Sequence, residues 1–347
     1  MLDSFELGPI RPPSEAYSLL IRVTRNCPWN RCKFCHTYKG EKFELRPVDD
    51  IKRDIQAARA IQEKINELSR QQGYGAERSV LAGPPNDAYR MVALWMYAGA
   101  KSAFLQDANT LIMPAAGLVE VIRHLKATFP SIERITSYGR SKTAAQKKPE
   151  ELAALHEAGL SRLHIGLETG SDALLKYIDK GVTAAEQIAG GKKVVASGIS
   201  LSEYVILGLG GKKMWREHAL ETARVLNEIN PDFIRVRTLS INSRMPLCAE
   251  VVNGNFARQT DEEIVEETKL LIEQLDCHAN FVSDHITNLL QELEGKLPDD
   301  KAKLLEIIAV FQALSADERA NFRVGRRLGI YSRLDDLNDA SRRERVE

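Results

Sequence analysis

The sequence predicts an α/β protein built as a partial (β/α)6 TIM-like barrel with a mainly helical C-terminal extension. Apolar, β-branched runs alternate with amphipathic helical segments six times between residues 17 and 245. The connections are short, which is typical of a parallel sheet in which each strand is followed by its own helix. From about residue 255 the pattern changes to helices alone. In such a fold the loops after the strands meet on one face, where chemistry usually takes place.

The composition is that of an ordinary globular protein. Of the 347 residues, 44% are hydrophobic and 28% charged, and 48 basic residues balance 48 acidic ones. A net charge of zero argues against nucleic acid or an anionic membrane as partner. No apolar run approaches the roughly 20 residues of a membrane helix. The N-terminus, "MLDSFELGPIRPPSEAYS", lacks the basic end and apolar core of a signal peptide. We therefore expect a cytoplasmic protein.

The elements follow from periodicity and punctuation. A strand is expected at 17–23, and a helix at 47–73 has Asp residues at its start and a Gly at its end. Pro84 and Pro85 mark a loop before a helix that begins near Asn86 or Asp87. The later strands are expected in "KSAFLQDANT", "IERITSYGR", "LSRLHIGLETG", "ISLSEYVILGLGG" and "DFIRVRTL". The helices after them are expected in "PAAGLVEVIRHLKATFP", "KPEELAALHEAG", "AAEQIAGGKKVVASG" and "WREHALETARVLNEIN".

The chain is expected to divide into an N-terminal extension (1–16), the barrel (17–250) and a helical extension (251–347). Helices are predicted in "RQTDEEIVEETKLLIEQL" and "DKAKLLEIIAVFQALSADERANF". The basic "RVGRRLGIYSR" is interpreted as a surface segment and "DASRRERVE" as a fraying tail. Because the extension lies outside the barrel motifs, it is a candidate lid over the active site.

Three of the five cysteines, Cys27, Cys32 and Cys35, lie within nine residues directly after the first predicted strand. In a cytoplasmic protein such a group indicates metal or catalytic thiols and not disulfides. Three thiolates suit a [4Fe–4S] cluster with one open iron. A zinc site is the alternative, but it usually has a fourth ligand at a recognisable spacing. His36 adjoins Cys35 and is too close to serve easily as that ligand, so the cluster is favoured.

Together with motifs further along, this loop resembles the radical S-adenosylmethionine superfamily over roughly residues 17–245. The family's usual spacing is C-x3-C-x2-C, and this chain has one more residue between its first two cysteines. Phe34, before the last cysteine, matches the family habit. The resemblance implies a [4Fe–4S] cluster and S-adenosyl-L-methionine as cofactors, with reductive cleavage to a 5′-deoxyadenosyl radical. It also implies a reducing partner such as flavodoxin or ferredoxin.

The next two motifs resemble the branch that contains coproporphyrinogen dehydrogenase-like and tRNA-modifying enzymes. "FLQDANTL" takes the place of a Gly-Gly-Glu-like turn, which implies that Gln106, Asp107 and Asn109 meet the methionine ammonium group. A helix cap before "PAAGLVEVI" is an equal alternative for these side chains. "HIGLETGSDALLKYIDKG" implies that Glu168 contacts the cofactor and Lys180 its carboxylate. A lysine at a helix C-terminus is the alternative for Lys180.

The fifth-strand motif, "YVILGLGG", implies that Ile206 packs on the adenine near Phe34, while its glycines permit close backbone approach. The lysines after it do not complete a phosphate-binding loop. Tyr138 in "TSYGR" and Arg237 in "FIRVRTL" are further cofactor candidates, although Arg237 and Arg235 could instead pair with Glu203 or Glu168. The candidates for catalysis are Cys277, His285 and Arg235. The segment "CHANFVSDH" could equally be an ordinary surface loop.

The favoured function is a radical S-adenosylmethionine enzyme that acts on a small organic substrate. One alternative is an RNA-modifying member of the same superfamily, which would favour a basic accessory domain that the sequence does not show. The other is a non-enzymatic metal-binding barrel protein, which does not explain why motifs recur at several strand ends.

Overall fold

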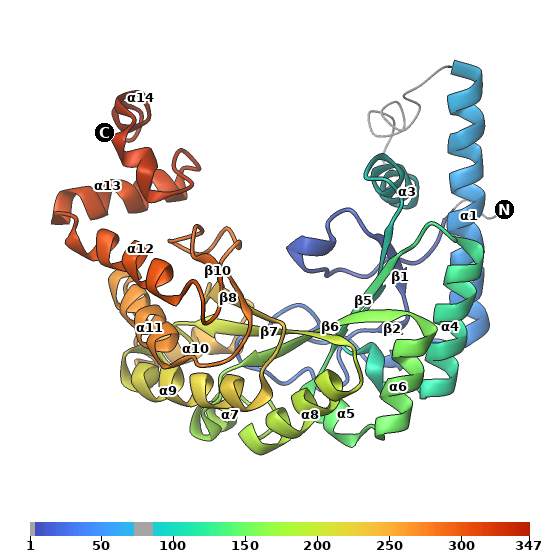
Figure 1. Cartoon of the computed structure of the whole chain (residues 1–347), viewed down its shortest axis with the longest axis horizontal. Coiled ribbons are helices and arrows are strands. Elements are labelled where there is room, and N and C mark those ends of the chain that lie inside the picture. The colour runs from blue at the N-terminus through green and yellow to red at the C-terminus, as the bar shows by residue number, and fades with distance from the viewer. Residues whose placement is uncertain (1–3, 73–85) are drawn as a thin grey trace. The chain divides into compact units, whose positions relative to one another are not determined.

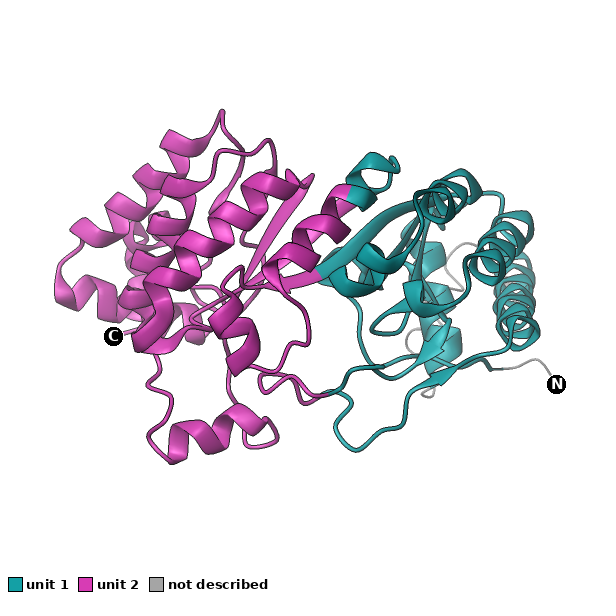
Figure 2. Cartoon of the chain, turned by 90° about the horizontal axis from the view of Figure 1, so that it is seen from below, with its two compact units in different colours: residues 1–30, 37–165, 193–200 teal, residues 31–36, 166–192, 201–347 magenta. Residues whose placement is uncertain are grey.

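A computed structural model describes residues 4–72 and 86–347 of the chain. The chain folds into two compact units, coloured in Figure 2. Unit 1 consists of residues 1–30, 37–165 and 193–200, and unit 2 of residues 31–36, 166–192 and 201–347. The loop predicted around Pro84 and Pro85 lies outside the described residues.

In the described residues, the main sheet has eight strands in the order β1-β4-β5-β6-β7-β8-β9-β10. Its first six strands match the predicted ones: β1 (Leu19–Arg22), β4 (Ser102–Gln106), β5 (Arg134–Gly139), β6 (Leu160–Glu168), β7 (Ser200–Leu207) and β8 (Phe233–Thr238). Pairings such as Leu20 with Phe104 and Phe104 with Thr136 are parallel. β1 and β10 are edge strands, so the sheet is not closed. The predicted partial barrel is confirmed.

The last two strands of the sheet come from the C-terminal extension. β9 (Asn280–Val282) runs parallel to β8, and β10 (Glu294–Lys296) runs antiparallel to β9. The sequence analysis expected only helices here. A strand of three residues is too short for an alternating pattern to be recognised, because the partner strand and not the local sequence stabilises it.

Unit 1 places its helices against the first strands of the sheet (Figure 1). Its helices are η1 (Pro13–Glu15), α1 (Val48–Gln72), α3 (Asp87–Tyr97), η2 (Thr110–Ile112), α4 (Ala115–Thr128), α5 (Ser141–Gln146) and α6 (Pro149–Ala158). A short ribbon joins β2 (Thr24–Arg25) to β3 (Glu44–Leu45). The predicted start of α3 is confirmed, since the Asn86 side chain accepts from the Tyr89 N–H at 3.1 Å. α1, α4 and α6 pack side by side.

Unit 2 contains most of the later helices. They are α7 (Asp172–Tyr177), α8 (Ala184–Ala196, which ends in unit 1), α9 (Gly211–Ile229), α10 (Pro246–Val252), α11 (Asp261–Gln274), α12 (Lys301–Ala313), α13 (Ala316–Arg327), η3 (Leu334–Asn338) and α14 (Ala340–Glu344). The helix predicted over "DKAKLLEIIAVFQALSADERANF" is two helices. Ser315 and Glu318 form a capping box that starts α13, because each side chain accepts from the other's N–H.

Two predictions for the C-terminus need correction. The basic segment is not only surface, because Arg326 donates to the carbonyl oxygens of Asn288, Leu289 and Tyr331 at 3.0, 2.9 and 2.7 Å. The tail forms α14, which is capped by the Asp339 side chain. These partners are distant loops and a local cap, which composition alone does not reveal.

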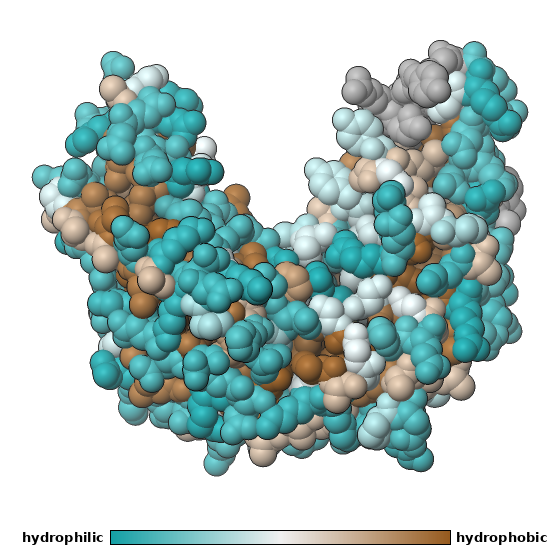
Figure 3. Space-filling model, in the orientation of Figure 1, coloured by the Kyte–Doolittle hydropathy of each residue, from teal (hydrophilic) through white to brown (hydrophobic). Residues whose placement is uncertain are grey.

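The extension has its own core and a partly apolar outer surface. Phe311, Phe322 and Tyr331 are buried, and the rings of Phe322 and Tyr331 stack with centroids 6.0 Å apart. Apolar residues gather over α12 in the space-filling view (Figure 3), where Val310 is 48% exposed. In the part of the chain that the structure describes, no helix combines the length and apolar composition needed to span a bilayer.

Candidate functional site

Asp107, directly after β4, binds both flanks of the cysteine loop within unit 1. It is fully buried and accepts from Arg22 Nη2 at 2.7 Å and from the Asn26 N–H at 3.2 Å. The Tyr38 hydroxyl also donates to it. Burial and the neighbouring Asp107 carboxylate raise the pKa of Tyr38, which keeps its hydroxyl a donor. Since Asn26 precedes Cys27 and Tyr38 follows His36 by two positions, this carboxylate attaches the loop to the sheet.

The side chains of Gln106 and Asn109 also form hydrogen bonds within unit 1. The Gln106 Oε1 accepts from the Gly8 N–H at 2.9 Å, and its Nε2 donates to the carbonyl oxygens of Gly8 and Ile10 at 3.0 and 2.7 Å. The Asn109 amide donates to Thr143 Oγ1 at 2.9 Å. Neither Asp107 nor Asn109 caps the following helix, since α4 begins after Pro114 without a side-chain cap. Contact of these residues with the cofactor stays a prediction.

The cysteine loop has thiols that suit an iron–sulfur cluster. Cys27, Cys32 and Cys35 are half-buried, and none of the three is in a disulfide. Cys27 Sγ accepts from the Asn30 N–H at 3.4 Å, a contact that also stabilises a thiolate ligand. Thiols outside any disulfide, partial burial and a backbone donor therefore fit the predicted cluster. Within residues 4–72 and 86–347, no three His, Cys, Asp or Glu side chains converge on a site for a single metal ion.

Unit 2 holds the second half of the loop by its backbone. The Lys33 N–H donates to the Ile178 carbonyl, and the Leu247 N–H donates to the Lys33 carbonyl, both at 2.9 Å. The Lys33 ammonium pairs with Glu250 at 2.8 Å. The residues that separate Cys32 from Cys35 are thus connected to the ends of α7 and α10.

Phe34 and Ile206, which the sequence analysis assigned to the same adenine, belong to one apolar cluster in unit 2. Both pack against Leu174, Ile178 and Leu209, which are fully buried. Phe34 comes from the cysteine loop and Ile206 from the end of β7. The structure therefore brings together two predicted site residues that lie far apart in the sequence.

Glu168 and Lys180 form a nearly buried ion pair beside this cluster. Their side-chain atoms are 2.7 Å apart, and Lys180 Nζ lies 5.6 Å from the centre of the Phe34 ring. A Cβ at Gly166 would lie 2.1 Å from Glu168 Oε1, so only glycine permits this arrangement. Glu168 has a φ of 65°, in the left-handed region that glycine favours, and such strain often marks a functional site. Lys180 lies after the end of α7, and its ammonium group forms an ion pair with Glu168.

Glu203 on β7 is a site residue that the sequence analysis named only as an alternative partner for an arginine. It is fully buried, and neither carboxylate oxygen has a hydrogen-bond partner among the described residues. Burial raises its pKa well above the ordinary value, the Glu168 carboxylate raises it further, and Lys180 opposes the shift. A lone glutamate inside the apolar run "SLSEYVILGLGG" was the signal that could have identified it.

A second buried acid–base pair supports the ends of β6 and β7. His218 on α9 has Nδ1 2.8 Å from Thr169 Oγ1 and Nε2 3.1 Å from the Ile206 carbonyl. Glu267 on α11 accepts from the Gly208 N–H at 2.8 Å. Burial lowers the pKa of His218 to about 4 and raises that of Glu267 to about 8, so both side chains are neutral near pH 7. The sequence analysis missed this pair because each residue lies in an ordinary helical pattern.

The arginines of β8 have partners other than the two glutamates that were considered. Arg235 pairs with Asp284 at 2.9 Å, and Arg237 Nη2 lies 2.7 Å from His285 Nε2. Burial and the Arg237 charge lower the pKa of His285 to about 4. The two partners follow β9 and so share the carboxyl end of the strands with the β8 arginines.

Cys277 and Tyr138 are the remaining residues that the sequence analysis named as candidates. Cys277 is buried three residues before β9, at the opposite end of that strand from His285. Burial raises the pKa of its thiol to about 11. The residues of "CHANFVSDH" are therefore divided between the amino and carboxyl ends of the strands. In unit 1, Tyr138 packs edge-on against Phe104, with ring centroids 5.1 Å apart.

Several solved structures align with part of this chain. Elp3 of the archaeon Methanocaldococcus infernus is 12% identical, with 49% of this chain and 44% of that chain aligned at a TM-score of 0.41. The radical S-adenosylmethionine methyltransferase TsrM from Kitasatospora setae is 15% identical over 68% and 39%, with a TM-score of 0.48. Coproporphyrinogen III oxidase HemN from Escherichia coli is 14% identical over 74% and 52%, at 0.46. This chain thus spans less than two thirds of each of these proteins, and no residue takes a role from them.

No curated protein matches the sequence at a significant level. The sequence model of the Radical SAM superfamily, however, matches residues 21–223. That span is more than half of the 347 residues, and it includes the three clustered cysteines, Glu168 and Ile206. The chain therefore belongs to the radical SAM superfamily, whose enzymes work with a [4Fe–4S] cluster and S-adenosylmethionine.

Proposed function

We propose that this radical SAM enzyme acts on a small organic molecule and holds its cluster through Cys27, Cys32 and Cys35. The observation that carries the cluster assignment is the set of three half-buried thiols outside any disulfide, one of which already accepts a backbone N–H. When bound, the cluster supplies an electron, and S-adenosylmethionine supplies the 5′-deoxyadenosyl radical. The chain's own residues orient these groups and exclude water.

The apolar cluster and the ion pair of unit 2 suit the two ends of S-adenosylmethionine. Phe34 and Ile206 offer an apolar surface to the adenine. Lys180 offers an ammonium group to the methionyl carboxylate, and Glu168 accepts from a ribose hydroxyl or from the amino group. In the absence of the cofactor these two side chains neutralise each other, so neither is a buried, unpaired charge. Tyr138 and Arg237 stay predicted cofactor residues.

The class of substrate is proposed from the net charge of the chain. A chain with zero net charge has no overall attraction for RNA, which favours a small substrate over a nucleic acid. The electron comes from a small reducing protein of the flavodoxin or ferredoxin class, and we place the protein in the cytoplasm.

The cluster assignment is tested by iron content. Cys27→Ala, Cys32→Ala and Cys35→Ala should each lose most of the iron after anaerobic reconstitution, because each removes one of three protein ligands. Cys248→Ala is the matched control and should keep its iron, since Cys248 lies on α10 outside the loop. A full iron complement in all three loop variants would show that other groups bind it.

Cofactor cleavage is tested separately. With dithionite, the reconstituted protein should convert S-adenosylmethionine to 5′-deoxyadenosine and methionine, measured by chromatography. A fully loaded protein that yields no 5′-deoxyadenosine, with or without candidate substrates, would mean that the cluster is structural or that another C–S bond is cleaved.

A further inference from the structure

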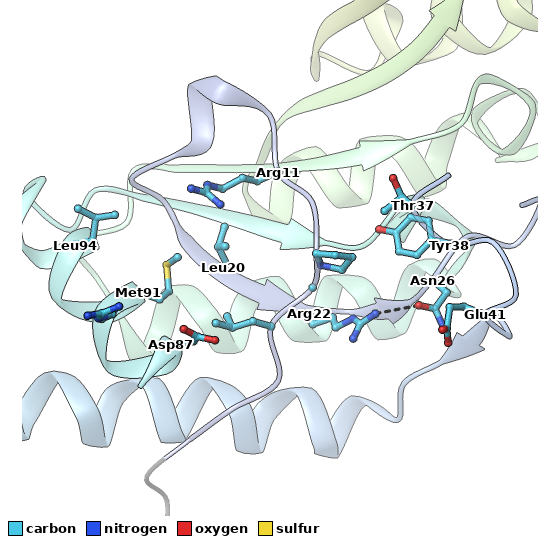
Figure 4. Close-up of a pocket in the computed structure, with 14 residues that line it drawn as sticks. Arg11, Leu20, Arg22, Asn26, Thr37, Tyr38, Glu41, Asp87, Met91 and Leu94 are labelled. Atoms are coloured by element: carbon cyan, nitrogen blue, oxygen red, sulfur yellow. Dashed lines mark hydrogen bonds between the residues drawn. The ribbon is translucent and has the colours of Figure 1, made fainter. Parts of the chain in front are cut away.

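Unit 1 contains a cavity of about 940 Å³ between the N-terminal segment, β1 and α3 (Figure 4). Its volume lies within the range of small-molecule sites, about 300–1,000 Å³. Leu20 and Met91 line it and are nearly fully buried. Asn26 and Tyr38, which flank the cysteine loop, also line it. The cavity therefore has an apolar floor and lies beside the cysteine loop, since Asn26 directly precedes Cys27.

The N-terminal wall of the cavity is firmly attached to the sheet. Gln106 makes three hydrogen bonds to the backbone of Gly8 and Ile10. Glu6 pairs with Arg22 at 2.9 Å and with Arg25 at 2.7 Å. A Cβ at Gly8 would lie 3.1 Å from Asp107 Oδ1 and 3.2 Å from Gln106 Cβ, so glycine permits this close approach. Gln106, from the motif expected to bind cofactor, thus holds one wall of this cavity in place.

Charges of both signs face the cavity. Arg22 is already neutralised by Glu6 and Asp107. Arg11, on the N-terminal segment, and Asp87, at the start of α3, line the cavity, and neither forms an ion pair with any residue of 4–72 or 86–347. Glu41 and Arg90 also line it. In Figure 4, Leu20 and Met91 lie between these two side chains. An apolar surface between a cation and an anion is complementary to a molecule that carries the opposite charges at its two ends.

We propose that this cavity binds the substrate, and that the substrate is a small zwitterion. Its apolar body lies on Leu20 and Met91, its carboxylate meets Arg11, and its ammonium group meets Asp87. This inference rests on the proposed function, which requires a small organic substrate. It adds the place where that substrate binds and the chemistry that recognises it.

The test uses three probes of matched length with the full-length protein: ω-aminooctanoate, octanoate and octylamine. Dissociation constants are measured by ligand-observed NMR in the presence of saturating S-adenosylhomocysteine, which fills the cofactor site. ω-Aminooctanoate should bind most tightly. Arg11→Gln should weaken ω-aminooctanoate and octanoate about three- to fivefold, as expected for a solvent-accessible ion pair, and leave octylamine unchanged. Asp87→Asn should weaken ω-aminooctanoate and octylamine and leave octanoate unchanged.

Two further variants test the location. Leu94→Trp places a large side chain in the cavity and should weaken all three probes. Tyr97→Trp, on the same helix but 60% exposed and outside the cavity, should change none of them. Arg123→Gln, an exposed position on α4, is the matched control for Arg11→Gln. The charge variants lie on exposed residues, so they test the proposal even if Leu94→Trp fails to fold.

The proposal is overturned if wild-type protein binds none of the probes, if the two charge variants affect all three probes equally, or if a correctly folded Leu94→Trp binds as wild type. Probe binding that is seen without S-adenosylhomocysteine and lost when it is saturating would also overturn the proposal, because the probes would then occupy the cofactor site. Cys35→Ala should lose iron yet retain probe binding. The cluster assignment and the cavity can therefore fail independently.

Discussion

At the scale of single residues, Asp107 accepts hydrogen bonds from Asn26 and Tyr38 while it pairs with Arg22. These contacts surround a carboxylate with no solvent exposure. Burying a charge is costly unless an opposite charge and hydrogen bonds compensate it. Here the compensation comes from both flanks of the cysteine loop, so the loop and the carboxylate stabilise each other.

Asp107→Asn should therefore destabilise the protein and loosen the loop. The amide keeps the size of the side chain but leaves Arg22 with less compensation, which should cost about 1–3 kcal/mol of unfolding free energy. Urea unfolding measures that loss, and the rate of iron release to a chelator measures the effect on the loop. Glu44→Gln, in an exposed pair with Arg25, is the control and should change stability by less than about 0.5 kcal/mol. Iron release at the wild-type rate in Asp107→Asn would contradict this role.

Glu168 lies in a conformation that glutamate rarely adopts, and its Oε1 accepts from Lys180 Nζ at 2.7 Å. Glu168→Gln should weaken S-adenosylmethionine binding about tenfold, as expected when a charged acceptor is lost, with iron content unchanged. Equilibrium dialysis of the reconstituted protein measures the affinity. Glu273→Gln, an exposed position on α11, is the control. Unchanged affinity in Glu168→Gln would mean that this carboxylate does not meet the cofactor.

At the scale of elements, two helices hold the turn that follows β7. α9 contributes His218, which lies 3.1 Å from the Ile206 carbonyl, and α11 contributes Glu267, which accepts from the Gly208 N–H. α11 belongs to the C-terminal extension and packs against α9. The extension therefore supports the segment that carries Ile206 from outside the predicted barrel.

This arrangement predicts how stability depends on pH. Burial raises the pKa of Glu267 from 4.5 to about 8, so the folded state keeps a proton that the unfolded state releases between these values. The Glu267 contribution to stability is therefore greatest below pH 4.5 and is lost as the pH rises to 8. Glu267→Gln does not lose this contribution. Its unfolding free energy should therefore rise relative to that of wild type as the pH increases from 4.5 to 8, by roughly 2–4 kcal/mol in total. Burial lowers the pKa of His218 to about 4, so this residue adds stability as the pH rises from 4 toward 6.5. Its Nε2 lies 3.4 Å from Glu267 Oε1, so Glu267→Gln also changes its surroundings.

Urea unfolding at several pH values measures the difference between the two proteins. A difference that stays constant from pH 4.5 to pH 8 would show that Glu267 does not titrate abnormally. Because His218 contacts Glu267, the same comparison in a His218→Gln background separates the two contributions.

At the scale of the whole molecule, the C-terminal extension completes unit 2 with two strands and several helices. Deletion of residues 280–347 removes β9, β10 and the buried rings of Phe281, Phe311 and Phe322. It also exposes β8 as an edge and leaves Arg235 without Asp284. We expect this truncated protein to be insoluble or readily proteolysed. Deletion of residues 339–347 removes only α14 and should leave a folded protein.

Limited proteolysis and near-UV circular dichroism distinguish these outcomes. A folded 1–279 protein that still cleaves S-adenosylmethionine would favour the predicted role of the extension as a lid over a role in completing the fold of unit 2. The predicted boundary at residue 250 stays a prediction.

The sequence by itself determined the strand–helix order and the cysteine trio. The order follows from hydrophobic periodicity, which depends on neighbours a few residues away. The cysteines are identified by their chemistry and spacing alone. Phe34 and Ile206 were related through the order of motifs, and packing of both on one apolar cluster agrees with that relation.

Only the tertiary structure decided what the polar side chains bind. Gln106 bonds to Gly8, 98 residues away, and Asp107 bonds to Asn26, 81 residues away. Burial, which no local pattern reveals, raises the pKa of Glu203 well above its ordinary value and that of Glu267 to about 8. β9 exists because β8 offers an edge, not because its three residues favour a strand. Periodicity depends on near neighbours and survives in the sequence, whereas the partner of a buried charge is known only when distant segments meet.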